Sequence, residues 1–384
     1  MTLQIALHVP GLRVGDRRSD QKVAPTVYPC MPMLRRSLVA LALLAAPTAF
    51  AAPGVDRRPP GGVLDPTPGP SPGPVAPAID PVPDKLDPGF TSGAACPRPD
   101  ACVQTDDDGD GVPDMWEDKL AVKFAPELHL PPQSEDWTRP ANVDWYLARV
   151  HMRFEHDDCS DCQVLGVGAV TQESMWQQSH RGKNWRCAHK GSWHASTEPT
   201  NFFLQPPNDS THNGAPPSEW RVYDHVRRIA TGYDIQFWVF FAYNDSVGSA
   251  NHEADWEHIT VRTDDDGNFV SAWYAQHEGG QRYTATALTF AGTHPRVWVA
   301  DGSHASYPSV GAFDIPNVPA FDDHTYDGGP VWQTWTNLIH VGEKSNPRGG
   351  QHFIRYGGRW GEHGSTPWTT GPRGPSFQGA WDGV

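Results

Sequence analysis

The stretch "YDIQFWVFFAYN", Tyr233 to Asn244, followed closely by "NHEADWEHITVRT", Asn251 to Thr263, indicates the fold. Both are strand-length runs of aromatic and β-branched residues, which favour extended structure. The residues "TDDDGN" that follow, 263–268, predict a hairpin. Similar runs, parted by Gly, Pro, Asn and Asp, occupy residues 142–154, 163–170, 219–229, 268–278, 282–290 and 296–307. No alternation of strands and helices is present, so we predict a mostly β fold, an antiparallel β-sandwich with long loops.

A calcium loop and a short helix are predicted ahead of the sandwich. The segment "DDDGDGVPDMWE", residues 106–117, matches the twelve-residue calcium loop, with oxygen ligands at alternating positions and a glycine at the sharp turn. The next residues, up to Pro126, have near-helical apolar spacing. A solvated acidic turn is the alternative interpretation. The expected ligands are Asp106, Asp108, Asp110, the Val112 carbonyl, Asp114 and Glu117.

Pro113 stands where paired EF-hands have an apolar residue, and the loop resembles the solitary, structural calcium loops of thrombospondin type 3 repeats. We therefore expect the loop and helix to form a unit over residues 95–121, with the β-sandwich domain spanning 122–384. Calcium is the expected cofactor.

The start of the chain predicts export. Arg35 and Arg36 precede an apolar run, and Ala49-Phe50-Ala51 forms a cleavage site. We expect a signal peptide within residues 1–51, with translation starting at Met31 or Met33, through either the general or the twin-arginine route. A Pro/Gly-rich linker follows over residues 52–94. No apolar run reaches the roughly 20 residues of a transmembrane helix, so a secreted or periplasmic protein is predicted.

Charge and cysteines narrow the possible partners. The formal net charge is −15, and removing residues 1–51, with six basic and two acidic residues, makes it −19. This argues against nucleic-acid binding.

After export, we expect Cys96 to pair with Cys102. Cys187 is expected to pair with Cys159 or Cys162, and the sequence does not choose between them. Zinc binding by these three with His156 or His189 is the alternative.

A second cation site is predicted within "NHEADWEHITV". In a strand that begins near Asp255, alternation places Asp255 and Glu257 on one face and Trp256 and His258 on the other. Two carboxylates on one face are costly unless a cation or proton lies between them.

The other expected ligands of this site lie nearby in the sequence. His252 enters from the preceding loop and Asp245 from the end of the previous strand, while His277 and His304 follow strand runs and could face the same cavity. We expect Ca²⁺, Mg²⁺, Mn²⁺ or Zn²⁺ here. The alternative is a salt-bridged sheet rim satisfied by Arg262, Arg282 and Arg296.

Two resemblances extend this interpretation. The motifs "FWVFFAYN", "HEADWEHITV", "AWYAQHEGG" and "HPRVWVADGSHASYPSVG" resemble, in order, the vacuolar protein sorting-associated protein 62 family over roughly residues 122–375. That family implies no established chemistry. Separately, His252, Asp255, Trp256 and Glu257 resemble the "GHRHDWE" heptapeptide of necrosis-inducing, ethylene-inducing-like cytolysins. That resemblance implies a secreted β-sandwich that holds a divalent cation and acts on sphingolipid head groups of plant membranes.

Two functions follow as expectations. The first is a secreted, calcium-binding recognition protein whose second cation site binds a glycolipid or glycan at a membrane surface. The second is a metal-dependent hydrolase of phosphoesters or glycosides that uses His252, Asp255, Glu257, His277 and His304. The sequence lacks a G-x-S-x-G elbow, an H-E-x-x-H motif, a Walker loop and a dinucleotide fingerprint.

Overall fold

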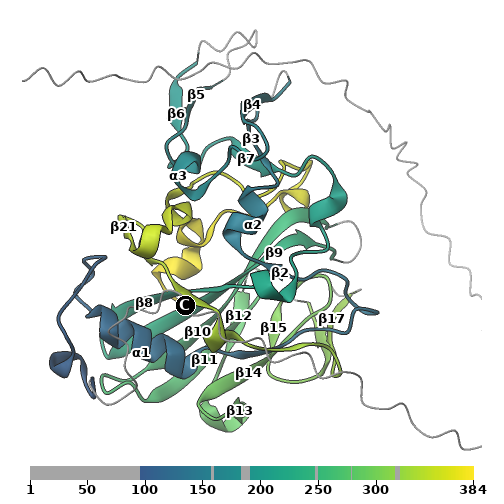
Figure 1. The fold of residues 1–384 in the computed structure, drawn as a ribbon. Coiled ribbons are helices and arrows are strands. Elements are labelled where there is room, and N and C mark those ends of the chain that lie inside the picture. The colour runs from purple at the N-terminus through teal and green to yellow at the C-terminus, as the bar shows by residue number, and fades with distance from the viewer. Residues whose placement is uncertain (1–95, 157–159, 183–190, 247–249, 278, 316–320) are drawn as a thin grey trace, which may run out of the picture.

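The computed structural model describes residues 96–156, 160–182, 191–246, 250–277, 279–315 and 321–384 (Figure 1). The expected signal peptide and the linker up to residue 94 lie outside these residues. Two β-sheets form the centre of the molecule. Among the described residues, no helix is long and apolar enough to cross a membrane.

The larger sheet is built from the run that indicated the fold. Its strand order is β12-β11-β10-β9-β8-β19, and β2 pairs with β9. The bounds are β2 Pro140–Ala141, β8 Val222–Ile229, β9 Gly232–Asn244, β10 His252–Thr263, β11 Phe269–Gln276, β12 Gly279–Tyr283 and β19 Leu338–His340. The predicted hairpin joins β10 and β11, which are antiparallel. Residues 235–241 of β9 are all buried, whichever face they point to, because both faces of this strand are covered.

The smaller sheet has the order β13-β14-β1-β18, with β15 pairing to β14. Its strands are β1 Glu127–His129, β13 Phe290–Ala291, β14 His294–Val299, β15 Ser306–Tyr307 and β18 Val331–Gln333. The predicted sandwich is confirmed, and most pairings are antiparallel. Two pairings in these sheets are parallel, β1 with β14 and β8 with β19, and each joins segments that are distant in the sequence.

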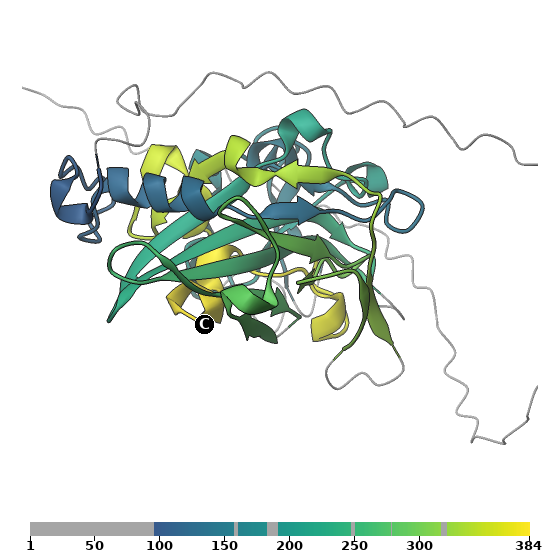
Figure 2. The same ribbon diagram turned by 90° about the horizontal axis from the view of Figure 1, so that it is seen from below.

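Helix α1, Asp114–Phe124, confirms the predicted helix before Pro126. It lies along the larger sheet (Figure 2). Trp116, Leu120 and Phe124 are buried in the main core, and the Trp116 ring meets that of Tyr233 edge-on at 6.0 Å. The helix beside the calcium loop therefore shares the hydrophobic core of the sandwich.

The other face of the larger sheet is covered by α2, Val143–Leu147, and by the C-terminal 3₁₀ turns. Trp256 and Trp360 meet there with ring centroids 5.1 Å apart, and Phe353 stacks on Trp256 at 5.7 Å. Trp360 is fully buried, whereas Trp368 is exposed. This aromatic layer packs against one face of β10, and the candidate site lies on the opposite face.

Four predicted strands are wrong in part. Within 163–170 the strand ends at Leu165, and within 296–307 residues 300–305 form a turn between β14 and β15. Residues 142–154 form α2 and then β3, His151–Phe154, because Asn142 caps a helix by accepting a hydrogen bond from the Trp145 backbone N–H. Within 282–290 the strand ends at Tyr283, and a 3₁₀ turn follows at Ala285–Ala287.

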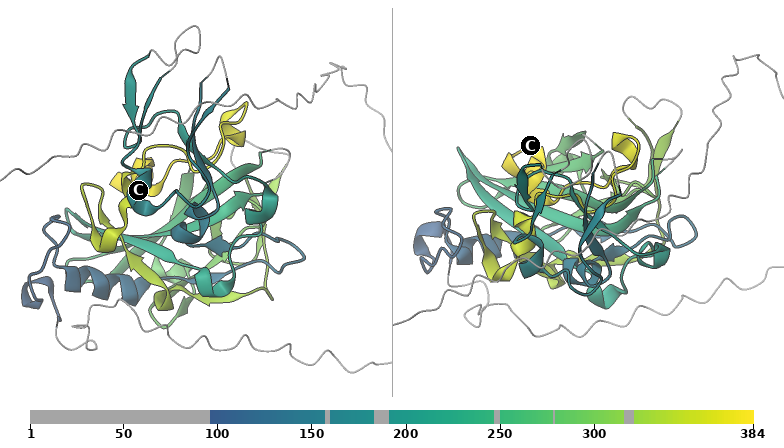
Figure 3. Two further views of the ribbon diagram at one scale, coloured as in Figure 1. Left: turned by 45° about the horizontal axis from the view of Figure 1, so that its top comes forward. Right: turned by 90° about the horizontal axis from the view of Figure 1, so that it is seen from above.

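The remaining elements lie outside the two main sheets. Strands β3, β4 and β7 form a small sheet, and β5 and β6 form a two-stranded antiparallel sheet; both lie on the side away from β13 (Figure 1). Figure 3 gives two further views of the fold. The bounds are α3 Gln172–Met175, β4 Cys162–Leu165, β5 Ser179–Arg181, β6 Trp193–Ala195, β7 Phe202–Gln205, β16 Gly311–Asp314, β17 Asp322–Thr325, β20 Gly342–Glu343 and β21 Asn346–Pro347.

Candidate metal centres

Backbone strain marks one end of the sandwich. Within the described residues, three non-glycine residues have left-handed φ angles: Ala254 at 59°, His277 at 54° and His304 at 58°. Each such conformation costs roughly 1–2 kcal/mol. All three border one cluster of charged side chains, where β10, β11 and the loop after β14 meet. Strain that gathers at a single place is typical of a functional site.

The carboxylates of the cluster come from β10. Its register with β9 is the same on both sides of Ala254, with Glu253 opposite Tyr243 and Asp255 opposite Phe241, so the left-handed Ala254 inserts no extra residue. Side chains therefore alternate regularly along the strand. Trp256 and His258 point toward the aromatic layer, and His258 lies against Trp238 at 4.5 Å, where burial lowers its pKa to about 4. Asp255 and Glu257 share the opposite face, as predicted.

Asp255 is held by a chain of buried polar groups. Its Oδ2 accepts hydrogen bonds from His304 Nδ1 at 2.9 Å and from Asn244 Nδ2 at 3.1 Å. His304 Nε2 lies 2.7 Å from Thr138 Oγ1, and the Thr138 hydroxyl lies 2.6 Å from an oxygen of Asp136. Burial raises the pKa of Asp255, but the hydrogen bond and charge of His304 outweigh this effect and hold the pKa below its usual value. His304 is brought to the site, but both of its ring nitrogens are engaged, so it positions Asp255.

Asp323 is the residue that the sequence analysis missed. Its oxygens accept hydrogen bonds from His277 Nε2 at 2.8 Å, Ser303 Oγ at 2.8 Å and Tyr307 Oη at 2.7 Å. The His277 bond, together with those from Tyr307 and Ser303, outweighs burial and lowers the pKa of Asp323. In return, the Asp323 carboxylate raises the pKa of His277 despite its burial. His277 thus reaches the cluster as expected, paired with a carboxylate from β17.

Glu257 lies near both of these satisfied carboxylates. Among the described residues it has no hydrogen-bond or ion-pair partner. Burial raises its pKa well above the usual value, and the charges of Asp255 and Asp323 raise it further. The side chain is half-buried, and a carboxylate placed beside two others is stabilised by a proton or a cation. Glu257 is therefore the position where a cation would relieve the most unfavourable electrostatic energy.

His252 and Asp245 lie at the edge of the cluster. His252 Nδ1 is 2.8 Å from the carbonyl of Ala254, and its charge contributes to the lowered pKa of Asp255. Asp245 accepts hydrogen bonds from Trp137 Nε1 and Asn251 Nδ2, both at 2.9 Å. The His252 Nε2 atom makes no hydrogen bond with a described residue. It is the imidazole nitrogen left to bind a ligand.

The salt-bridge alternative does not hold for the arginines that it named. Arg262 forms a two-pronged pair with Asp234, Arg296 pairs with Glu127, and Arg282 donates to the carbonyl of Val384. None of the three pairs with the carboxylates of β10. Among the described residues, Asp255 accepts hydrogen bonds from His304 and Asn244, and Glu257 has no hydrogen-bond partner.

Three of the six expected ligands of the predicted calcium loop converge. Ligand atoms of Asp106, Asp108 and Asp110 lie within 4.8 Å of one another. Asp106 also accepts hydrogen bonds from the backbone N–H groups of Gly109 and Gly111, whose φ angles of 80° and 89° suit glycine. The β10 set is not among the groups within this distance in the part of the chain that the structure describes.

Arg348, from the segment after β21, reaches into the calcium loop. Its guanidinium lies 3.2 Å from Glu117 Oε2, 3.1 Å from Asp118 Oδ1 and 3.4 Å from Asp114 Oδ1. Burial raises the pKa of Glu117 well above its usual value, and the charge of Asp108 adds to this, while Arg348 opposes it. Burial and the charge of Asp110 raise the pKa of Asp108 to about 7. The loop is thus a set of crowded carboxylates, partly neutralised by one arginine.

The cysteines agree in part with expectation. The disulfide between Cys96 and Cys102 is present. Cys162 is also disulfide-bonded, while Cys159, Cys187 and His189 lie outside the described residues. Donor atoms of His156, His180 and Cys162 lie within 4.8 Å of one another. A cysteine in a disulfide offers no thiolate, which weighs against the zinc alternative at Cys162.

Known proteins resemble this chain in two ways. Residues 210–314 match the model of the family described as vacuolar protein sorting-associated protein 62. This confirms the resemblance over a shorter stretch than the 122–375 expected. No curated protein sequence matches the chain.

Three of the similar solved structures are toxins or toxin-like proteins. "Toxin fold as basis for microbial attack and plant defense" has a TM-score of 0.32 at 13% identity, covering 69% of this chain and 86% of its own. "NLPPya in complex with glucosamine" has a TM-score of 0.34 at 12% identity, with 74% and 94% covered. Necrosis and Ethylene inducing Protein 2, from the causal agent of cocoa's Witches Broom disease, has 0.34 at 12%, with 74% and 95% covered. Proteins whose heptapeptide the sequence resembles are thus among the similar structures. Because each TM-score is below 0.5, we base no functional conclusion on them.

Proposed function

We propose that this protein is exported and binds a divalent cation at Asp255 and Glu257, through which it recognises a glycan or glycolipid head group at a membrane surface. His252 Nε2 completes the cation's protein ligands, and Asp245 lies beside them. A separate calcium ion in the loop 106–117 stabilises the fold. The cation is Ca²⁺, Mg²⁺, Mn²⁺ or Zn²⁺, all of which accept carboxylate oxygens.

One observation carries the proposal: Glu257 is a half-buried carboxylate without a partner among the described residues, beside Asp255 and Asp323, which both accept hydrogen bonds. His304 and His277 fix those two neighbours, and both histidines have strained backbones. A protein that needed only a stable core would not accumulate this strain and repulsion at one point. A bound cation accounts for both.

The chemistry of such a site suits sugars. A hard cation held by two carboxylates and an imidazole keeps open coordination positions, which vicinal hydroxyls or an acidic head-group oxygen fill. The proposed mature chain has a formal charge of −19, so a cation is also needed to bring it to an anionic surface. The resemblance of His252, Asp255 and Glu257 to the cytolysin heptapeptide supports the same ligand class.

The calcium loop has a structural part in this proposal. Asp106, Asp108 and Asp110 converge, and the loop leads directly into α1, whose Trp116 lies in the main core. Calcium would offset the repulsion among these carboxylates and thereby order the start of the helix. Arg348 forms an ion pair with Glu117, so a bound calcium ion would compete with Arg348 for this carboxylate.

Vesicle sedimentation tests the recognition. Phosphatidylcholine vesicles with and without a glycosylceramide are mixed with protein in Mn²⁺, Ca²⁺ or chelator. We expect sedimentation only with both glycolipid and cation, lost in Glu257→Gln and kept in Glu198→Gln, an exposed control. Equal binding in chelator, or full binding by the Glu257 variant, contradicts the proposal, as does the absence of cation-dependent binding to any vesicle.

A metal-dependent hydrolase is the second candidate, because His277 and Asp323 form a dyad with Nε2 and Oδ2 only 2.8 Å apart. The His277 side chain is 27% exposed and could take a proton from a metal-bound water. Release of nitrophenol from a panel of aryl phosphates and glycosides, dependent on Mn²⁺ and lost in His277→Ala, would favour this function. Cation-dependent vesicle binding without product release favours recognition.

Export is tested on the protein itself. N-terminal sequencing of material recovered from the culture medium or periplasm is expected to begin at or near residue 52, after the Ala49-Phe50-Ala51 site. Protein that retains the segment from Met33 would contradict this part of the proposal.

A further inference from the structure

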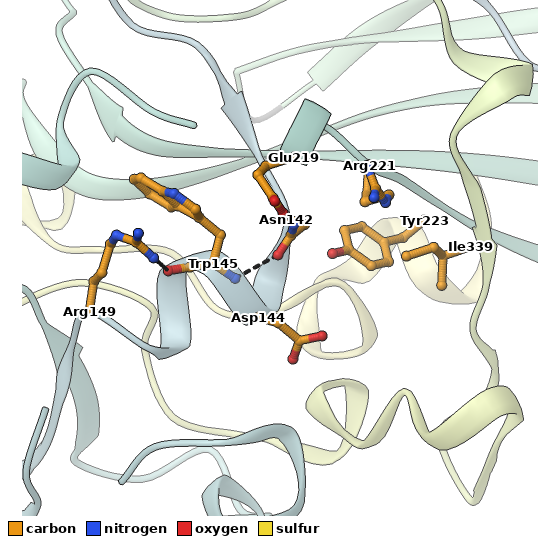
Figure 4. A pocket seen from close by; sticks show the side chains of 8 residues that line it. All are labelled: Asn142, Asp144, Trp145, Arg149, Glu219, Arg221, Tyr223 and Ile339. Carbon is orange, nitrogen blue, oxygen red and sulfur yellow. Dashed lines mark hydrogen bonds between the residues drawn. The ribbon is translucent and has the colours of Figure 1, made fainter. Parts of the chain in front are cut away.

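A pocket of about 430 Å³ lies between α2, the start of β8 and the edge strand β19 (Figure 4). It is separate from the candidate cation site. Tyr223, which lines it, contacts Trp256 with ring centroids 5.7 Å apart, and Trp256 points to the opposite face of β10 from Asp255 and Glu257. A ligand in this pocket would therefore not touch the cation.

The polar groups that line the pocket are held in place. Asn142 accepts a hydrogen bond from the Trp145 backbone N–H at 2.5 Å and donates one to Glu219 Oε2 at 2.5 Å. The Tyr223 hydroxyl accepts a hydrogen bond from the backbone N–H of Val143 at 2.7 Å. The wall is therefore rigid before any ligand arrives, which reduces the entropic cost of binding.

Several of these groups keep unused hydrogen-bonding capacity. Tyr223 is 2% exposed, and among the described residues its hydroxyl hydrogen has no acceptor. Glu219 uses one carboxylate oxygen for Asn142 and leaves the other unbonded. Asp144 likewise uses one oxygen, for Gln172. Within the described ranges, the Arg221 guanidinium donates hydrogen bonds through Nη1 alone, to backbone carbonyls of its own turn. Donors and acceptors thus face the same space.

The pocket also has an aromatic wall and a balanced charge. The guanidinium of Arg149 lies 4.3 Å from the centre of a Trp145 ring and fixes that side chain. Two carboxylates and two guanidinium groups line the pocket, so its formal charge is zero. A phosphate would be repelled by the carboxylates, and an ammonium group would be repelled by the arginines. A neutral molecule with many hydroxyls and an apolar face would avoid both repulsions.

We propose that this pocket is a binding site for a neutral sugar, with Trp145 as its apolar wall and Glu219, Asp144 and Tyr223 as partners of sugar hydroxyls. The site works without the cation and is independent of the recognition proposed above. Together, the two sites would let the protein hold a glycan at two places.

The experiment uses the full mature chain in chelator, so that no divalent cation occupies the candidate cation site. Methyl glycosides of glucose, galactose, mannose, xylose and N-acetylglucosamine, with inorganic phosphate for comparison, are tested by ligand-observed NMR and titration calorimetry. We expect one or more glycosides to bind in the millimolar range, and Trp145→Ala to weaken binding about tenfold. Glu257→Gln is expected to leave this binding unchanged, which separates the result from that of the cation site.

A second variant keeps the test decisive if Trp145→Ala fails to fold. Glu219→Gln retains the hydrogen bond from Asn142 and removes the charge, and it is also expected to weaken glycoside binding. Absence of binding by every glycoside overturns the proposal. So does binding that neither variant changes, and so does binding of phosphate in preference to the sugars.

Discussion

Replacement of Glu257 by glutamine is expected to stabilise the cation-free protein. Burial, Asp255 and Asp323 raise the pKa of Glu257 in the folded state. A carboxyl group with a raised folded pKa favours folding below its unfolded pKa, and this contribution is lost as pH rises through the folded value. The wild type loses this contribution progressively as pH rises above the unfolded value. Single substitutions that relieve one unfavourable interaction typically change stability by about 0.5–3 kcal/mol, and we expect a gain of about 1–2 kcal/mol here. That corresponds to a rise in Tm of about 2–6 °C.

Thermal unfolding in chelator, and again with saturating Mn²⁺ or Ca²⁺, measures this effect. At pH 7.5 in chelator, Glu257→Gln should melt above the wild type. At pH 4 the difference should be much smaller, because Glu257 is then largely protonated in both states. Added cation should raise the Tm of the wild type more than that of the variant. Glu198→Gln, on the surface, should match the wild type throughout. A Glu257 variant less stable than the wild type in chelator at pH 7.5 would refute the reasoning.

Four further predictions concern the calcium loop and the polar chain behind the site. Calcium at about 100 times its Kd should raise Tm by about 5–10 °C, measured by calorimetry, and Glu117→Gln should abolish this shift and the protection of residues 106–117 from proteolysis. Because burial and a neighbouring carboxylate raise the pKa of Asp108 to about 7, calcium affinity should fall as pH drops through 7, since the ion must displace that proton; titrations at pH 6 and 8 check the sign. Arg348→Gln should raise calcium affinity about threefold to tenfold by removing a competing cation, and an unchanged Kd would contradict this. His304→Ala should cost about 3–5 kcal/mol in a denaturant titration, because it leaves a buried carboxylate without its partner.

The long strands could be predicted from sequence, and the short ones could not. β9 and β10 carry enough aromatic and β-branched residues for their composition to determine their structure. β1 is three residues long and exists because it pairs with β14 and β18, which follow more than 160 residues later. The pairing partner of such a strand is not encoded nearby. The helix α2 was missed because a single cap at Asn142 overrode the strand-like composition.

The candidate site was predictable where it depends on local geometry. Alternation along β10 places Asp255 and Glu257 on one face, and the constant register with β9 keeps them there. Asp323 could not be found in this way, because its role comes from contacts with His277 and Tyr307 made across the sandwich. Its only signal in the sequence is the acidic, alternating stretch "DDHTYD", residues 322–327.

The role of His304 also required the structure. Its sequence position after a strand suggested a ligand, but both of its ring nitrogens are engaged in the chain that holds Asp255. Arg348 was missed for a similar reason, because 231 residues separate it from Glu117. Sequence reasoning identifies ligands that lie close together along the chain, and tertiary contacts decide which of them stay available.

The most direct test of the account is a calorimetric titration of divalent cations into a variant whose calcium loop can no longer bind calcium. Asp106→Asn and Glu117→Gln together remove that site, and the folded double variant is titrated with Ca²⁺, Mg²⁺, Mn²⁺ and Zn²⁺. The account predicts that at least one of these ions binds with a stoichiometry of one and that adding Glu257→Gln abolishes this binding. A folded double variant that binds none of the four ions, or binding that survives the Glu257 substitution, would contradict it.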